Sequence, residues 1–116
     1  MGLHPTSCIP GRAVTTRFEF DWDPAKAASN IAKHGVSFDE AMTVFLDPLA
    51  LSRLDDAHGA AEERWVTIGL SRATNLVVVV HTDVEFDEER VYIRIISARR
   101  PTKNERRQYE QTPEQG

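Results

Sequence analysis

The chain has 116 residues, a formal net charge of −4, an apolar share of 41% and a charged share of 28%. These values are typical of one globular domain and exclude a low-complexity or strongly basic chain. The longest aliphatic run, Leu76 to Val80, is too short to cross a membrane, and a lone cysteine excludes an internal disulfide, so we expect a cytoplasmic protein.

The N-terminal half predicts one strand and two helices. Residues 1–16 mix proline, glycine and threonine without periodicity and are expected to form a flexible extension. RFEFDW alternates like a strand from Arg17, and Asp23 with Pro24 then opens a helix that Gly35 ends. A second helix starts at the capping box of Ser37 and Glu40. Its expected buried stripe consists of Phe38, Ala41, Met42 and Phe45.

The C-terminal half predicts strands followed by a basic helix. LALSRL, RWVTIGLS, LVVVVHTD and RVYIRIISA read as strands, and Thr102 with Glu105 forms the capping box of the last helix. We expect an α+β domain over residues 17–111, followed by a short tail at 112–116. In this domain a mostly antiparallel β-sheet has the first two helices packed on one face.

Sequence motifs exclude several chemistries. No phosphate-binding loop, dinucleotide fingerprint, esterase elbow or H-E-x-x-H zinc motif occurs in the sequence. The carboxylates and imidazole of LDDAHG are more typical of a solvated turn than of a metal site. We therefore expect no metal and no cofactor.

The strands suggest a polar surface on the sheet. If Ser71 faces Leu76 and Asp83 faces Arg90, then Val66, His81 and Tyr92 form one cross-strand row. That register places Arg64 and Arg94 on the same face. A slip of one residue would move part of the set to the other face, and paired or half-buried side chains are the alternative interpretation.

The first helix suggests a second basic strip. Helical spacing puts Lys26, Asn30, Lys33 and His34 in one quadrant, opposite an expected core face of Ala28, Ile31 and Ala32. His34 directly precedes the Gly35 cap, so it either interacts with the last carbonyl groups of the helix or takes part in catalysis.

Three motifs carry a family resemblance. W-D-x-x-K begins at Trp22, N-x-x-K-H-G spans 30–35, and I-S-A-R spans 96–99. With the segments around them, over residues 18 to about 110, the chain resembles the BrnT toxins of type II toxin–antitoxin systems. The resemblance implies a RelE-like fold, an RNA-cleaving inhibitor of translation, and a BrnA-like ribbon-helix-helix antitoxin as partner. An N-terminal extension and a long acidic DVEFDEER connection depart from the family pattern.

The mechanism that suits these residues is metal-independent transesterification of RNA. Guanidinium groups would stabilise the charge that builds on the phosphate while the ribose 2′-hydroxyl attacks. We assign catalysis to His34, Arg64 and Arg99, and RNA positioning to a further set with His81 as the reserve base: Lys33, Arg94, Tyr109 and His81. In a simple meander Arg64 and Arg99 lie at opposite ends, so they can share one phosphate only if the sheet curves or the last helix folds back.

Two other functions fit the same charges. A non-catalytic RNA-binding module would explain the basic tail, and binding without cleavage would identify it. A protein-interaction domain would use the basic surface to dock an acidic partner. A toxin dimer within an antitoxin complex is a further hypothesis that no residue argues for.

Overall fold

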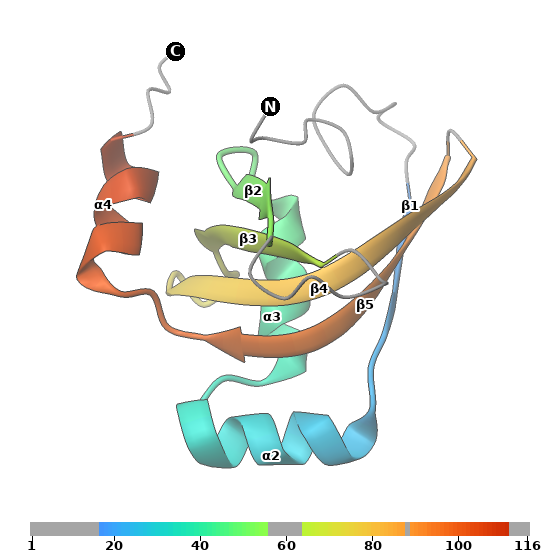
Figure 1. The fold of residues 1–116 in the computed structure, drawn as a ribbon, viewed down its shortest axis with the longest axis horizontal. Helices are drawn as coiled ribbons and strands as arrows, with labels where there is room; N and C mark the ends of the chain where they lie inside the picture. Colours follow the sequence, from blue (N-terminus) through green and yellow to red (C-terminus); the bar gives the residue numbers. More distant parts are fainter. Residues whose placement is uncertain (1–16, 56–63, 88, 112–116) are drawn as a thin grey trace.

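The computed structural model describes residues 17–55, 64–87 and 89–111. The predicted extension at 1–16 and tail at 112–116 lie outside the described residues. The described part is an α+β fold, as the sequence predicts, with a five-stranded sheet in the order β1-β5-β4-β3-β2 (Figure 1). β1 pairs with β5 in parallel and the other neighbouring pairs are antiparallel.

The N-terminal elements begin and end where their capping residues are. β1 (Arg17–Asp21) leads into α2 (Pro24–His34), where the Asp23 side chain accepts a hydrogen bond from the Ala25 amide. Gly35 ends α2 with a φ of 71°, a left-handed conformation that glycine adopts without strain. α3 (Phe38–Thr43) starts at Ser37, whose hydroxyl accepts from the Glu40 amide, and continues into η1 (Val44–Leu46).

The remaining strands form an antiparallel meander. β2 (Leu51–Leu54), β3 (Trp65–Leu70), β4 (Leu76–Asp87) and β5 (Arg90–Arg99) follow in order. α4 (Lys103–Gln111) starts at the predicted capping box, in which the Thr102 hydroxyl accepts from the Glu105 amide and the Glu105 carboxylate accepts from the Thr102 amide.

The core lies between one face of the sheet and the helices α3 and η1. Phe38, Ala41 and Phe45 are buried as predicted, and they pack on apolar side chains of the two longest strands: Val77, Val79, Val91, Ile93, Ile95 and Ala98. Gly69 allows η1 to approach β3, because an added Cβ would lie 2.8 Å from a methyl carbon of Val44. We call this side of the sheet the covered face and the other side the open face.

The helix α2 buries a different side from the one predicted. Ala28 and Ala32 are exposed and Ile31 is 51% exposed, whereas Asn30 is 6% exposed. The Asn30 amide donates to the carbonyl oxygens of Val36 and Ala98, and its oxygen accepts from the Ala98 amide. These bonds fix α2 beside the end of β5, so the helix is oriented by a polar anchor and not by its apolar stripe.

The predicted strand register is wrong. Leu70, not Ser71, pairs with Leu76, and Asp87, not Asp83, pairs with Arg90. Irregularities at Val80/His81 and Glu85/Asp87 shift the β4–β5 pairing, which hydrophobic alternation cannot foresee.

Candidate RNA-cleaving site on the open face of the sheet

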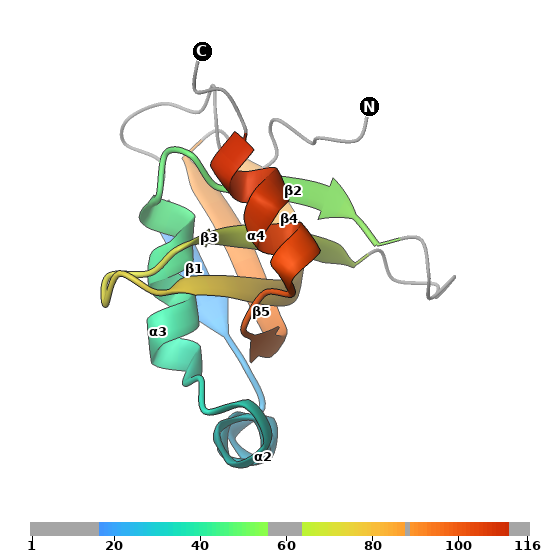
Figure 2. The same ribbon diagram turned by 90° about the vertical axis from the view of Figure 1, so that its left-hand side faces the viewer.

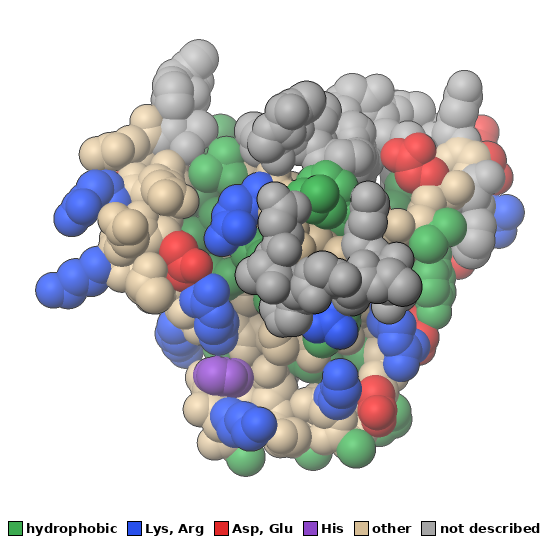
Figure 3. Space-filling view, viewed as in Figure 1, with side chains coloured by type: hydrophobic (Ala, Val, Ile, Leu, Met, Phe, Trp, Pro, Cys, Tyr) green, Lys and Arg blue, Asp and Glu red, His purple; other side chains and the backbone are tan. Residues whose placement is uncertain are grey.

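The open face carries the arginines of the strands. Figure 3 shows this face, with Lys and Arg side chains distributed from α4 across the sheet toward α2. In the register, Arg99 lies in a row with Val78, Ile68 and Leu51, and Arg53 lies in the next row with Val66 and Val80. A third row holds Arg94 between Thr82 and Asp21.

Arg64 belongs to the row of Arg94. Trp65 pairs with His81, so Arg64, one residue earlier, is opposite Thr82, and Thr82 pairs with Arg94. Neighbouring strands are spaced about 4.8 Å apart, which puts the two arginine backbones about 10 Å from each other. Within the described residues, the Nε atom of Arg64 is buried and has no hydrogen-bond partner, so this guanidinium has an unsatisfied donor in the fold.

Asp21, Tyr92 and Arg94 form a hydrogen-bonded cluster beside that row. The Tyr92 hydroxyl donates to Asp21 Oδ2 at 2.7 Å, and Arg94 Nη1 donates to the same oxygen. The Tyr92 hydrogen bond, with help from the Arg94 charge, lowers the pKa of Asp21, while the same contact raises the pKa of Tyr92. Asp21 is therefore a carboxylate at neutral pH, and Tyr92 keeps its proton.

Arg99 lies in a different environment at the other end of β5. Its Nη1 and Nη2 atoms donate to Glu105 Oε1 and Oε2 at 2.8 and 2.9 Å, a bidentate pair. The Arg99 hydrogen bond lowers the pKa of Glu105 to about 2. One open-face row, that of Arg53, Val66 and Val80, lies between the row of Arg99 and that of Arg64, so the register does not bring the two arginines to one phosphate.

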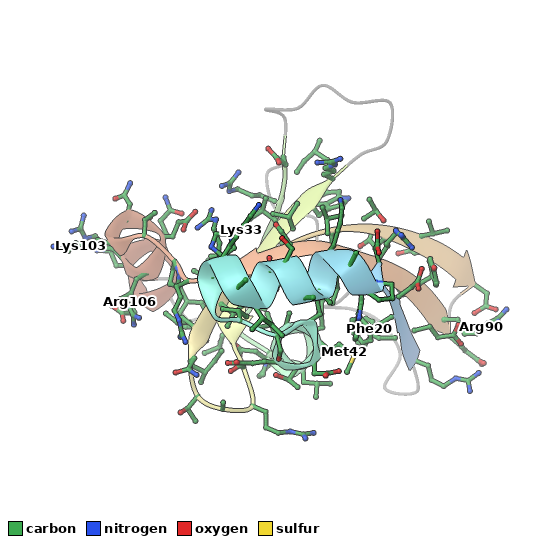
Figure 4. The ribbon with its side chains drawn as sticks, turned by 90° about the horizontal axis from the view of Figure 1, so that it is seen from below. Phe20, Lys33, Met42, Arg90, Lys103 and Arg106 are labelled. Atoms are coloured by element: carbon green, nitrogen blue, oxygen red, sulfur yellow. The ribbon has the colours of Figure 1, made fainter. Side chains whose placement is uncertain are left out.

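Lys33 and His34 lie on the same side as Arg99. Both are exposed in the last turn of α2, one turn after Asn30, whose side chain holds the Ala98 backbone next to Arg99. Figure 4 shows Lys33 at the end of α2 that faces Lys103 and Arg106 of α4. We call the basic side chains at this end of the domain, from the end of α2, the end of β5 and the start of α4, the basic corner: Lys33, His34, Arg99, Arg100, Lys103 and Arg106.

His81 lies in the core and not on the predicted RNA-binding surface. Its side chain is 0% exposed on the covered face, its ring centroid is 4.8 Å from that of Phe45, and its Nε2 atom is 2.7 Å from the Thr67 hydroxyl. Desolvation lowers the pKa of His81 to about 4. Because the β4 register differs from the predicted one, Val84 and not His81 pairs with Tyr92.

Tyr109 holds α4 against the body of the domain. Its hydroxyl donates to Asp47 Oδ2 at 2.6 Å, and the same carboxylate accepts from the Leu70 amide at 2.8 Å. Burial and the Asp47 carboxylate raise the pKa of Tyr109. The residue predicted to position RNA therefore has its hydroxyl engaged within the fold.

Sequence reasoning missed the acids that partner these arginines. Asp21 reaches Arg94 because β1 pairs with β5 in parallel, a long-range contact with no local sequence signal. Glu105 was readable as a capping residue, and only the structure shows that it also binds Arg99. Within the described ranges, no group of three or more His, Cys, Asp or Glu side chains is arranged to hold a metal ion.

A family model for the ribonuclease toxin BrnT of type II toxin–antitoxin systems matches residues 22–105. The chain belongs to this family. The crystal structure of the Brucella abortus ribonuclease toxin BrnT has 24% sequence identity and a TM-score of 0.53, and the match covers 75% of this chain and 100% of that one. No curated protein matches the sequence.

Membership of the BrnT family confirms the resemblance read from the three motifs. The chain is a ribonuclease toxin of the type II class, so its partners include an RNA target and an antitoxin. The likeness to the Brucella structure supports the α+β fold with its mostly antiparallel sheet. In the described part of the chain, no helix has the length and apolar character needed to span a membrane.

Proposed function

We propose that this BrnT-family chain cleaves RNA without a metal ion, on the open face of its sheet, and thereby inhibits translation in the cytoplasm. The observation that carries the proposal is the row that joins Arg64 to Arg94 beside the Asp21–Tyr92 pair. Two guanidinium groups there can bind the oxygens of one phosphate, where negative charge grows as the 2′-hydroxyl attacks.

Roles follow from what surrounds each group. Arg64 has a buried Nε donor with no partner in the described part of the chain, and Arg94 is exposed in the same row, so both are assigned to the reacting phosphate. Asp21, held as a carboxylate beside Arg94, is assigned as the acceptor of the 2′-hydroxyl proton. Tyr92, whose hydroxyl donates to Asp21, is assigned as the proton donor to the leaving oxygen. This assignment adds Asp21 and Tyr92 to the residues proposed from the sequence.

The basic corner is assigned to the RNA that flanks the reacting phosphate. Lys33 and Arg99 supply charge for phosphates there, and His34 supplies an exposed imidazole with two ring nitrogens for hydrogen bonds to the RNA. The catalytic roles predicted for His34 and Arg99 stay predictions. His34→Gln separates them, because glutamine keeps a polar side chain but cannot exchange a proton: a loss of about 10²-fold in cleavage supports catalysis, and unchanged cleavage supports contact alone.

Cleavage of a defined single-stranded RNA tests the mechanism. We expect activity to persist in excess EDTA, to leave 2′,3′-cyclic phosphate ends, and to fall about 10²-fold in Arg64→Ala with the fold retained. Arg72→Ala is the matched control, since Arg72 is exposed in the β3–β4 turn away from the row. Activity abolished by EDTA and restored by magnesium would exclude the metal-independent scheme.

The proposed antitoxin is a BrnA-like ribbon-helix-helix protein. The basic corner and α4 offer the charge for an acidic partner, and a toxin dimer within that complex is the corresponding oligomeric hypothesis. Co-purification of this chain with the product of an adjacent reading frame, followed by mass determination of the complex, tests both. Recovery of the chain alone at low salt would contradict the partner assignment.

A further inference from the structure

A cavity of about 280 Å³ opens on the open face between α4 and the strands β2, β3 and β4. Its floor is apolar and consists of Leu51, Val66, Ile68 and Val78, and Gln108 lines it from α4. The volume is at the lower end for a small-ligand site. It suits a ligand with one planar ring system and not a longer ligand such as a peptide segment.

Two polar contacts fix the wall that α4 contributes. Glu105 binds Arg99 before Gln108 in the helix, and Tyr109 binds Asp47 directly after it. Both ends of this helical turn are therefore tied to the sheet and to the loop after η1. The cavity is formed before a ligand arrives, which lowers the entropic cost of binding.

Charged side chains border the cavity. Arg53 lines it from the row of Val66. Glu105 lines it from α4 and pairs with Arg99, which lies in the row of Ile68 and Val78. A ligand that fits must combine a flat, weakly polar group with negative charge next to it. A nucleotide of single-stranded RNA has this combination, because its base is planar and each neighbouring linkage is an anionic phosphate.

We infer that this cavity binds one unstacked base of the RNA substrate and sets the sequence preference of cleavage. The inference rests on the proposed function, because the Arg64–Arg94 row lies on the same face, next to the row of Arg53, Val66 and Val80 that forms one side of the cavity. Gln108, Arg53 and Glu105 are the long polar side chains that line the cavity, and their donors and acceptors are the groups assigned to discriminate between base edges.

The test uses the full chain, short RNAs with the fluorescent base 2-aminopurine at successive positions, and Val66→Phe to fill the cavity. We expect one position to change emission on binding, and Val66→Phe to abolish that change and to weaken RNA binding about tenfold. Leu70→Phe is the matched control, because Leu70 is 40% exposed, does not line the cavity and should leave both unchanged.

Cleavage-site mapping on a random-sequence RNA separates this inference from the proposed function. Retained cleavage with a flattened base preference in Val66→Phe and in Gln108→Ala supports the cavity assignment. Cleavage with an unaltered preference and unaltered emission in a folded Val66→Phe overturns it and leaves the ribonuclease proposal standing. Base insertion without cleavage supports the cavity and overturns the proposed mechanism. Loss of antitoxin binding with RNA binding unchanged makes the cavity a protein-docking site and overturns the inference.

Discussion

Polar side chains are buried on the covered face of the sheet and solvent-exposed on the open face. On the covered face, His81 and Thr67 are buried and hydrogen-bonded to each other, and the core side chains around them are apolar. On the open face, Arg94 and Asp21 form an ion pair whose side chains are 44% and 42% exposed. Polar groups therefore stabilise the fold on one side and remain accessible to a ligand on the other.

Figure 2 shows α3 on one side of the strands and α4 crossing their end. The contrast between the two faces predicts that different substitutions affect stability and RNA cleavage. Substitutions of buried polar groups should lower the free energy of unfolding strongly. Substitutions of the open-face arginines should lower RNA cleavage at nearly constant stability.

The largest effect is expected for Asn30→Ala. The side chain makes three hydrogen bonds to the backbone of Val36 and Ala98, and alanine would leave these buried groups unpaired. We expect the free energy of unfolding to fall by about 4 kcal/mol, measured by urea denaturation. The exposed neighbour Ser29→Ala should change it by less than about 0.5 kcal/mol. Equal effects of the two substitutions would show that Asn30 does not anchor α2.

Asn30 also shows what the sequence could and could not predict. Capping residues predict both ends of α2 and the start of α3 correctly, because caps act within a few residues. The buried side of α2 depends on a bond to Ala98, 68 residues away, which no local pattern contains. The register of β4 with β5 depends on two irregularities in the pairing, and with it the predicted row of His81 and Tyr92 was lost.

The candidate site was likewise predictable from the sequence only where local patterns determine it. The sequence predicts that Arg64 and Arg94 lie on one face, and extending the observed β3–β4 register by one residue aligns Arg64 with the row of Arg94, through a different register from the predicted one. Their carboxylate neighbour Asp21 arrives with a parallel strand from the start of the domain. Residue type identified the chemistry, while long-range pairing decided which residues meet.

The next largest effect is the dependence of the free energy of unfolding on acidic pH, which we expect from the buried His81. Its pKa is about 4 in the fold because of desolvation, against 6.5 for a solvated imidazole. Between these pH values the unfolded chain binds the additional proton, so stability falls as the pH falls from about 6.5 to 4, by about 3 kcal/mol for this group. His81→Gln should lose this slope while acidic groups keep theirs. Identical pH dependence of unfolding in both proteins would contradict a buried neutral imidazole.

On the open face, Arg94→Ala should slow RNA cleavage about 10²-fold, equivalent to about 2.7 kcal/mol of barrier. Its ion pair with Asp21 is solvent-exposed, so the free energy of unfolding should change by less than about 1 kcal/mol. Single-turnover cleavage and denaturation of the same sample measure both quantities. Arg90→Ala, further along the strand in an exposed pair with Asp87, is the control for loss of charge. A large loss of stability without loss of cleavage would reverse the contrast between the faces.

The smallest effect is expected for Glu105→Gln. The Arg99–Glu105 pair is intermediate between the buried polar groups and the exposed ion pairs, because the Glu105 side chain is 20% exposed and that of Arg99 is 36% exposed. The folded pKa of Glu105, about 2, lies below its ordinary value of 4.5, so the pair stabilises the fold above pH 4.5 and this contribution is lost as the pH falls toward 2. After allowance for solvent screening we expect Glu105→Gln to lower the free energy of unfolding by at most about 1 kcal/mol at neutral pH.

The substitution also removes a negative charge from the basic corner, and RNA binding at low salt should therefore strengthen two- to threefold, by about 0.5 kcal/mol. Glu110→Gln, in the exposed pair with Arg106, should strengthen RNA binding less and leave stability unchanged. Weaker RNA binding in Glu105→Gln, but not in Glu110→Gln, would mean that Glu105 holds Arg99 in its binding orientation. The ion pair would then have a structural role like that of the buried polar groups on the covered face.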